Sequence, residues 1–213
     1  MDAHLRLDEA KESSGSITSE PGITIPWKFF RGQNAANQAR WLVVLGEDDA
    51  LETKPAWLTK AIGDAPALLV APRGTGALKW ADPAPYYIQR SLALLGRTVD
   101  GGKLFDVLAV ARQAGSSGAA KWNIIGRGRE GVIGAYAALF EPRIAQITAI
   151  DPPATHREGP IFLNVLRVLD VPDVLALLAP RPVKILTAQR TAFDRIGKID
   201  RISGGNCQFD DLP

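Results

Sequence analysis

The turn at residues 126–131, which reads Gly-Arg-Gly-Arg-Glu-Gly, is the part of this sequence best suited to carry chemistry. It follows the apolar run 122–125 and precedes the amphipathic segment 130–140, so the pattern predicts a strand, a sharp turn and a helix. In α/β proteins such a turn can present a serine nucleophile, in the pattern G-x-S-x-G. It can also bind a pyrophosphate, in the pattern G-x-G-x-x-G.

The pyrophosphate pattern fits the turn literally, with Gly126, Gly128 and Gly131 at the glycine positions. Asp151 ends the next apolar run, close to the offset of about 20 residues expected of an acid that binds a ribose. Against this interpretation, the turn does not open the predicted domain, and Glu130 would repel a phosphate at the helix N-terminus. A module that binds a dinucleotide such as NAD(H) stays open as an alternative.

The nucleophile pattern fits the context of the turn but not its central residue. Aligned on G-x-S-x-G, the sequence has Gly128 where the serine would stand. Glycine has no side chain that could attack a carbonyl carbon, so the turn predicts no nucleophile.

Arginines in and near the turn could instead bind a carboxylate or a phosphate. Arg127 and Arg129 lie within the turn, and Arg73 follows the apolar run 67–71. The alternative is a structural network of ion pairs with nearby acids, such as Glu130. The candidate ligand site at the strand ends comprises Arg73, Gly74, Gly126, Arg127, Gly128, Arg129, Asp151 and His156. Trp80, in a polar loop, is the one tryptophan that is a candidate to face a ligand.

Short apolar runs, separated by segments of helical spacing, must position these residues. Strands that alternate with helices pair in parallel, and strands that are apolar on both faces are covered by helices on both sides. The sequence therefore predicts an α/β domain with a doubly wound, mostly parallel sheet and helices on both faces. Strands are expected over 23–27, 41–45, 67–71, 122–125, 145–150 and 183–186, and helices over 55–62, 86–95, 104–112, 130–140, 162–169 and 174–178.

Four segments resemble the α/β-hydrolase superfamily, and more narrowly the bacterial acetyl xylan esterases and dipeptidyl-peptidase-like hydrolases. They are RGTG at 73–76, LLGRTVDGGKLFDVLAVA at 94–111, the glycine turn, and LLAPRPVKIL at 177–186. The likeness covers about residues 67–190. It implies an α/β-hydrolase-like fold that is truncated at the C-terminal end, since such hydrolases continue with another strand and helix.

The resemblance also implies catalytic residues that this chain lacks, which makes it a degenerate member. The general base should follow the last strand, yet no histidine occurs after His156. Asp194 could stand at the place of the acid, but it has no base to orient. The acids Glu47, Asp48 and Asp49 would place negative charge where an oxyanion must form. We therefore predict no catalytic residue, and neither a metal nor a cofactor.

Composition limits the remaining classes of protein. The 213 residues are 46% hydrophobic and 23% charged, which suits a globular chain. The net charge of +2, without a basic cluster, argues against nucleic acid, and no apolar stretch approaches the roughly 20 residues that cross a membrane. No signal peptide is recognisable, which indicates the cytoplasm if the chain is complete. We expect a flexible lead-in over 1–22, the α/β-hydrolase-like domain over 23–194 and a polar tail over 195–213.

The function expected from the sequence is that of a non-catalytic accessory or ligand-binding domain. Its expected partner is a catalytic hydrolase domain, or a small-molecule or carbohydrate ester. Two alternatives remain open. One is an active carboxylesterase or acetyl xylan esterase that uses non-standard residues, and the other is the dinucleotide-binding module.

Overall fold

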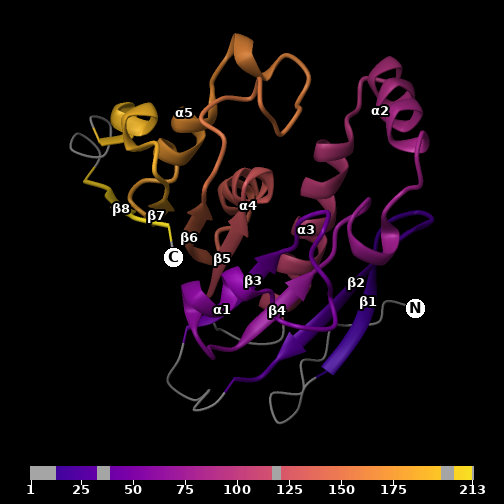
Figure 1. Ribbon diagram of the computed structural model, residues 1–213, viewed down its shortest axis with the longest axis horizontal. Helices are drawn as coiled ribbons and strands as arrows, with labels where there is room; N and C mark the ends of the chain where they lie inside the picture. Colours follow the sequence, from indigo (N-terminus) through magenta and orange to yellow (C-terminus); the bar gives the residue numbers. More distant parts are fainter. Residues whose placement is uncertain (1–12, 33–38, 117–120, 198–203, 213) are drawn as a thin grey trace.

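Eight strands form one sheet at the centre of the computed structural model, in the spatial order β1-β2-β4-β3-β5-β6-β7-β8 (Figure 1). The structure describes residues 13–32, 39–116, 121–197 and 204–212. β2 runs antiparallel to both of its neighbours, β1 and β4, and all the other neighbouring strands are parallel. The strands are β1 (Ser13–Glu20), β2 (Ile23–Phe30), β3 (Arg40–Val44), β4 (Ala67–Val70), β5 (Trp122–Arg127), β6 (Ile144–Ile150), β7 (Pro182–Leu186) and β8 (Asn206–Asp210).

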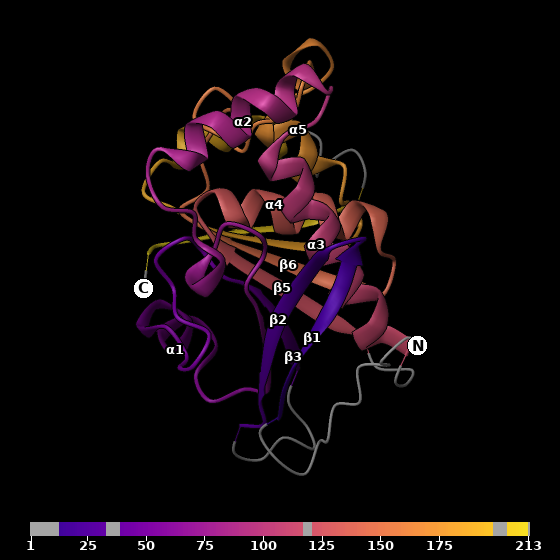
Figure 2. The same cartoon turned by 90° about the vertical axis from the view of Figure 1, so that its right-hand side faces the viewer.

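Helices cover both faces of this sheet, so that it is enclosed between two apolar layers (Figure 2). On one face, Leu58 of α1 belongs to a core cluster with Ile125 of β5. On the other, α3, α4 and α5 contribute Val107, Ile133 and Val174 to a larger cluster. The helices are α1 (Ala56–Ile62), α2 (Ala84–Leu94), α3 (Val99–Ser116), α4 (Arg129–Phe140) and α5 (Val171–Ala176), with 3₁₀ turns η2 (Gly76–Leu78), η3 (Val165–Arg167) and η4 (Arg190–Phe193).

The predicted fold class, a mostly parallel doubly wound sheet with helices on both faces, is confirmed. All six predicted strands are present, as β2 to β7. Strands β3 to β7 were recognisable because a strand covered on both faces must be apolar at nearly every position, and every residue of β4 is buried.

The lead-in and the tail contain strands that the sequence analysis missed. β1 lies within the segment expected to be flexible, so that expectation is wrong for residues 13–20. In this polar edge strand Ile17 is the only fully buried side chain, and the pairing with β2 holds the strand in place. Residues 1–12 lie outside the described part of the chain.

A further strand, which the sequence did not predict, follows β7, because β8 pairs in parallel with β7 and extends the sheet. Its sequence alternates half-buried and exposed residues, which is a weak signal in a strand of only five residues. The helix expected over 162–169 is wrong too. That segment forms only the short turn η3, which follows Asn164 in the left-handed conformation, with φ 61°.

Helix α2 differs from the other helices because none of its residues is buried. It lies at the rim of the molecule, away from the sheet, in both views (Figures 1 and 2). Leu94 and the adjoining Leu95 are 83% and 75% exposed. Within the described residues, no helix is both long enough and apolar enough to span a lipid bilayer.

Candidate functional site

The turn between β5 and α4 brings the chain from strand to helix through a single residue, Gly128. Its backbone has φ 62° and ψ −130°, a conformation that favours glycine. The Gly128 N–H donates to the carbonyl of Ile150 at 2.7 Å, which ties the turn to the end of β6. A Cβ atom added to Gly128 would meet no other atom within 4 Å. The apex of the turn therefore faces open space, with no side chain to occupy it.

The two flanking glycines have a different role, which is to let α4 approach the sheet. A Cβ atom on Gly126 would lie 2.6 Å from the carbonyl group of Glu130. A Cβ atom on Gly131 would lie 2.9 Å from the Gly126 carbonyl oxygen and 3.3 Å from Ala149. Contacts this short are excluded, so packing alone accounts for both glycines. The three-glycine pattern thus has a structural cause that needs no bound pyrophosphate.

Arg73 is held in a buried network rather than at the strand-end site. Its Nε and Nη2 atoms donate to the two carboxylate oxygens of Asp106 at 2.9 and 2.7 Å, and its backbone N–H donates to the same carboxylate. Nη2 also donates to Glu20 at 3.0 Å. Burial lowers the pKa of Arg73, but the bonds to Asp106 and Glu20 outweigh it and raise that pKa. The ion-pair alternative therefore fits Arg73, with partners that the sequence did not identify.

The network depends on a glycine of α3. The Asp106 carboxylate is completely buried, and it also accepts a hydrogen bond from the Ser19 hydroxyl at 2.6 Å. A Cβ atom on Gly102 would lie 2.7 to 2.8 Å from the Arg73 guanidinium. The missing side chain therefore gives Arg73 room to cross α3 and reach Asp106. This cluster ties β1, the end of β4 and α3 together.

His156 is a buried structural residue with both ring nitrogens engaged. Its Nδ1 atom is 2.8 Å from the Pro160 carbonyl oxygen, which can only accept, so Nδ1 donates. Its Nε2 atom is 2.9 Å from the Tyr136 hydroxyl. Burial, with a smaller contribution from the charge of Asp170, raises the pKa of Tyr136 and keeps the hydroxyl protonated. This histidine has no free nitrogen with which to accept a proton from a nucleophile.

Asp170 completes the cluster around His156. It accepts hydrogen bonds from the Thr155 hydroxyl and the His156 N–H, each at 2.7 Å, and it caps α5. Burial alone would raise the pKa of Asp170, but the bonds from Thr155, His156 and Val171 outweigh it and lower that pKa. The loop after β6 is therefore fixed by its own polar groups.

The acidic side chains after β3 lie where a backbone N–H donor would be needed to stabilise an oxyanion. The Gly46 N–H donates to the Asp49 carboxylate at 2.9 Å, and the Trp57 indole donates to the same carboxylate at 3.1 Å. Glu130, which pairs with Lys103 at 3.2 Å, adds a second carboxylate next to Gly46. Within the described residues, no three His, Cys, Asp or Glu side chains gather as a metal site would require.

A small hollow of about 140 Å³ lies beyond the ends of β3, β4 and β5. Gly74 and Arg129 of the predicted set line it, together with Trp80 and Lys103. The Trp80 ring lies against Gly74, where a Cβ atom would be 2.8 Å from it. Ligand pockets usually enclose about 300–1,000 Å³, so this hollow is small for a binding site.

Comparisons with known proteins leave the fold as the only shared feature. No family model and no curated protein sequence matches this chain. Among solved structures, a putative acetyl xylan esterase from Bacteroides fragilis has a TM-score of 0.67 at 15% identity, over 94% of this chain and 66% of that one. An α/β hydrolase from Penicillium, GrgF, has a TM-score of 0.58 at 14% identity, over 95% of this chain and 89% of that one. This chain has the α/β-hydrolase fold.

A third structure with this fold shows how far lengths vary among such proteins. An acylaminoacyl peptidase from Pyrococcus horikoshii has a TM-score of 0.64 at 12% identity, and the match covers 95% of this chain but 37% of that one. Our chain thus spans less than two thirds of the length of the peptidase and of the acetyl xylan esterase. At such low identities the likeness extends to the fold alone.

Within the α/β-hydrolase fold, the structure separates the predicted site residues. Only Gly74 and Arg129 meet in the strand-end hollow. Arg73, Gly126 and His156 have structural partners instead. The remaining ones lie at strand ends, where Arg127 and Asp151 are exposed and Gly128 forms the apex.

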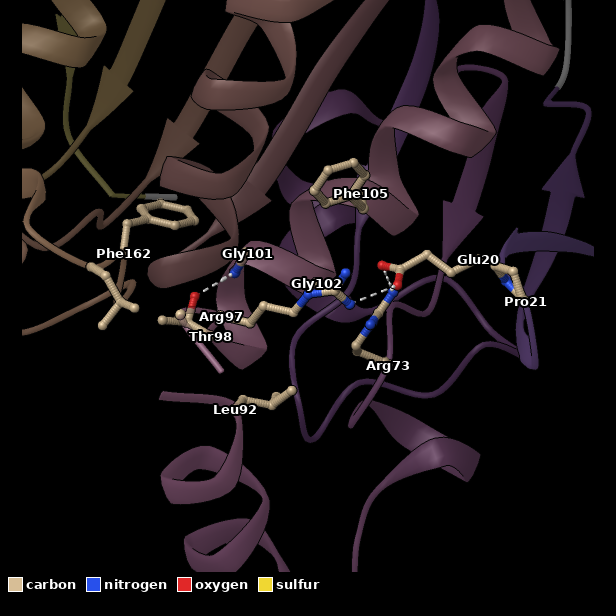
Figure 3. A pocket seen from close by; sticks show the side chains of 12 residues that line it. Glu20, Pro21, Arg73, Leu92, Arg97, Thr98, Gly101, Gly102, Phe105 and Phe162 are labelled. Carbon is tan, nitrogen blue, oxygen red and sulfur yellow. Dashed lines mark hydrogen bonds and ion pairs between the residues drawn. The ribbon is translucent and has the colours of Figure 1, made fainter. Parts of the chain in front are cut away.

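A larger cavity lies outside the strand ends, where the sequence predicted no site. It has a volume of about 680 Å³ and lies where α2, the start of α3 and the turn after β1 meet (Figure 3). Two signals could have drawn attention to it. In the sequence, Asp106 is an acid within the otherwise apolar segment 104–111, and Phe105 beside it is a large aromatic, which the structure leaves 59% exposed.

Proposed function

We propose that this chain is a hydrolase-fold domain that binds a ligand without cleaving it. The observation that carries the proposal is Gly128. The backbone of the turn retains the geometry that lifts a nucleophile above the sheet, while the residue at the apex has only hydrogen as its side chain. Acyl transfer cannot begin there, because no atom is present to attack the carbonyl carbon.

The surroundings of Gly128 support the same conclusion. The sequence has two histidines; His156 has both ring nitrogens in use, and His4 lies outside the described residues. The Gly46 N–H, which could stabilise an oxyanion, already donates to Asp49. A carboxylate at this place would repel the negative charge of a tetrahedral intermediate, so the electrostatic contribution to catalysis is reversed.

Binding is the role that remains for a fold whose catalytic groups are missing. In the proposed role the domain acts as an accessory to a catalytic hydrolase domain or recognises a small molecule, with carbohydrate esters as one class. Functions are grafted onto a fold through particular side chains, so a hydrolase fold without a nucleophile is compatible with recognition alone.

An ester-hydrolysis assay of the full chain tests the proposal. With p-nitrophenyl acetate between pH 6 and pH 9, we expect no rate above that of buffer for the wild-type protein or for His4→Gln. Treatment with a fluorophosphonate, followed by intact-mass measurement, should add no adduct. A rate proportional to protein concentration, together with one covalent adduct per chain, would overturn the proposal. Loss of that rate in His4→Gln would identify the base.

A further inference from the structure

The cavity beside α2 and α3 has the size and composition of a small-molecule site. Its volume of about 680 Å³ falls inside the range of about 300–1,000 Å³ typical of ligand pockets. Its walls come from segments far apart in the sequence, which are the turn after β1, the α2–α3 connection, the first turns of α3 and the loop after β6 (Figure 3). Arg73, which follows β4, completes the lining, so a ligand here would contact several separate parts of the chain.

The walls of the cavity are largely apolar. Leu92 of α2, Phe105 of α3 and Phe162 of the loop after β6 form much of the surface. Phe105 is 59% exposed, although the next turns of the same helix are buried in the core. Water next to such surfaces is released when an apolar ligand covers them, so the cavity favours a ligand with an apolar body.

Two arginines reach the cavity, and only one of them is available to a ligand. Arg73 is committed to Asp106 and Glu20 through bonds of 2.7 to 3.0 Å. Arg97 has a side chain that is 69% exposed, and its contact with Glu20 is 3.6 Å long. Figure 3 shows both arginines directed at the Glu20 carboxylate. Arg97 can therefore turn to a new anion, because Glu20 keeps its shorter bond to Arg73.

We propose that this cavity binds a monocarboxylic acid with an apolar, aromatic or aliphatic body, and that Arg97 binds its carboxylate. A guanidinium matches a carboxylate with two parallel N–H donors, which a neutral amide or an alcohol cannot use equally well. This proposal rests on the proposed function, according to which the domain binds a ligand. It names the class of that ligand and places it beside α3 rather than at Gly128.

Isothermal titration calorimetry of the full chain with 3-phenylpropionate tests whether Arg97 recognises the negative charge of the carboxylate. The neutral isostere 3-phenylpropanamide is the control ligand. We expect Arg97→Gln to weaken binding of the acid by about tenfold or more, as for hydrogen bonds to charged groups, and to leave binding of the amide unchanged. Arg195→Gln is the matched control variant, because the Arg195 side chain is 70% exposed and also pairs with a single acid, but does not line the cavity.

A second pair of variants tests the apolar wall. Phe105→Ala should weaken binding of the acid and of the amide alike. Phe140→Ala should change neither, since Phe140 is also 59% exposed but does not line the cavity. Circular dichroism and thermal unfolding of each variant verify that the fold is kept.

The outcomes separate this site from the proposed function. Absence of saturable binding, or acid binding that Arg97→Gln and Phe105→Ala leave unchanged, overturns the cavity site and does not bear on hydrolysis. Ester hydrolysis by a protein whose acid binding depends on Arg97 overturns the non-catalytic function and leaves the cavity site standing. An equal loss in Arg97→Gln and Arg195→Gln also overturns the role of Arg97.

Discussion

The turn at Gly128 and the cavity beside α2 show opposite relations between structure and chemistry. At the turn the backbone is fixed by close packing on both sides, yet the apex residue, Gly128, has no side chain. At the cavity the packing is loose, since α2 has no buried residue, yet charged and aromatic side chains converge. Close packing alone is therefore enough to explain the geometry of a strand-to-helix turn. Charged and aromatic side chains can converge on a cavity next to a helix that is only loosely packed.

The largest effect on stability is expected at Asp106, which anchors the wall of the cavity. Asp106→Asn should lower the free energy of unfolding by about 3–5 kcal/mol, because Arg73 would lose its buried and closest counter-charge and keep only the more exposed Glu20. Urea denaturation measures the change. The matched control is Asp210→Asn, which breaks an exposed pair with Lys184 and should cost far less, because solvent screens an exposed ion pair. Equal losses in both variants would show that the Arg73 network does not anchor the wall.

The packing at the turn is tested by Gly126→Ala. A Cβ atom 2.6 Å from the carbonyl of Glu130 must push α4 away from β5, at a cost of about 3 kcal/mol. Gly134→Ala, on the same helix, is the control. Its Cβ atom would make ordinary contacts at 3.5 to 3.7 Å, and alanine gains up to about 1 kcal/mol over glycine inside a helix. A stable Gly126→Ala protein would contradict the packing explanation of the turn.

A serine placed at the apex of the turn tests whether Gly128 alone prevents hydrolysis. Gly128→Ser meets no steric obstacle, but its positive φ should cost about 1–2 kcal/mol of stability. We expect no hydrolysis of p-nitrophenyl acetate, because the described residues offer no free imidazole and the Gly46 N–H is already bonded. Denaturation curves and the ester assay measure the two effects. Hydrolysis by this variant alone would mean that a base exists near the turn.

Asp170 should make the folded state, including the loop that carries Phe162 to the cavity, less stable in acid. The lowered pKa of Asp170 stabilises the folded state above the ordinary pKa of aspartate, near 3.9, and this contribution is lost as the pH falls through the folded value. The wild-type Tm should therefore fall by a few degrees more between pH 5 and pH 3 than that of Asp170→Asn. Parallel curves for the two proteins would exclude Asp170 as a source of the acid sensitivity.

The smallest effect is expected on the exposed surface of α2. Leu94→Gln should change the free energy of unfolding by about 0.5 kcal/mol or less, because the side chain is 83% exposed. Ile133→Ala on α4, where the side chain is completely buried, should cost about 2–5 kcal/mol. Urea denaturation compares the two. A large loss in Leu94→Gln would mean that α2 is packed against another part of the protein in solution.

The parts of this structure that could be predicted from the sequence are those set by local pattern. The strands β3 to β7 and the turn at Gly128 were recognisable because burial on both faces requires nearly continuous apolar runs, and because glycines are typical of a sharp turn. The absence of a serine at the apex was equally visible. These features depend on residues that are neighbours in the chain.

Only the tertiary structure decided the partners of polar groups and the place of the cavity. Arg73 pairs with Asp106, which lies 33 positions further along the chain, and His156 is held by Tyr136 and Pro160. The polar strands β1 and β8 are held in the sheet by pairing with β2 and β7. The physical reason is that burial and hydrogen bonding are satisfied by whichever groups the fold brings together. Sequence spacing does not contain that information.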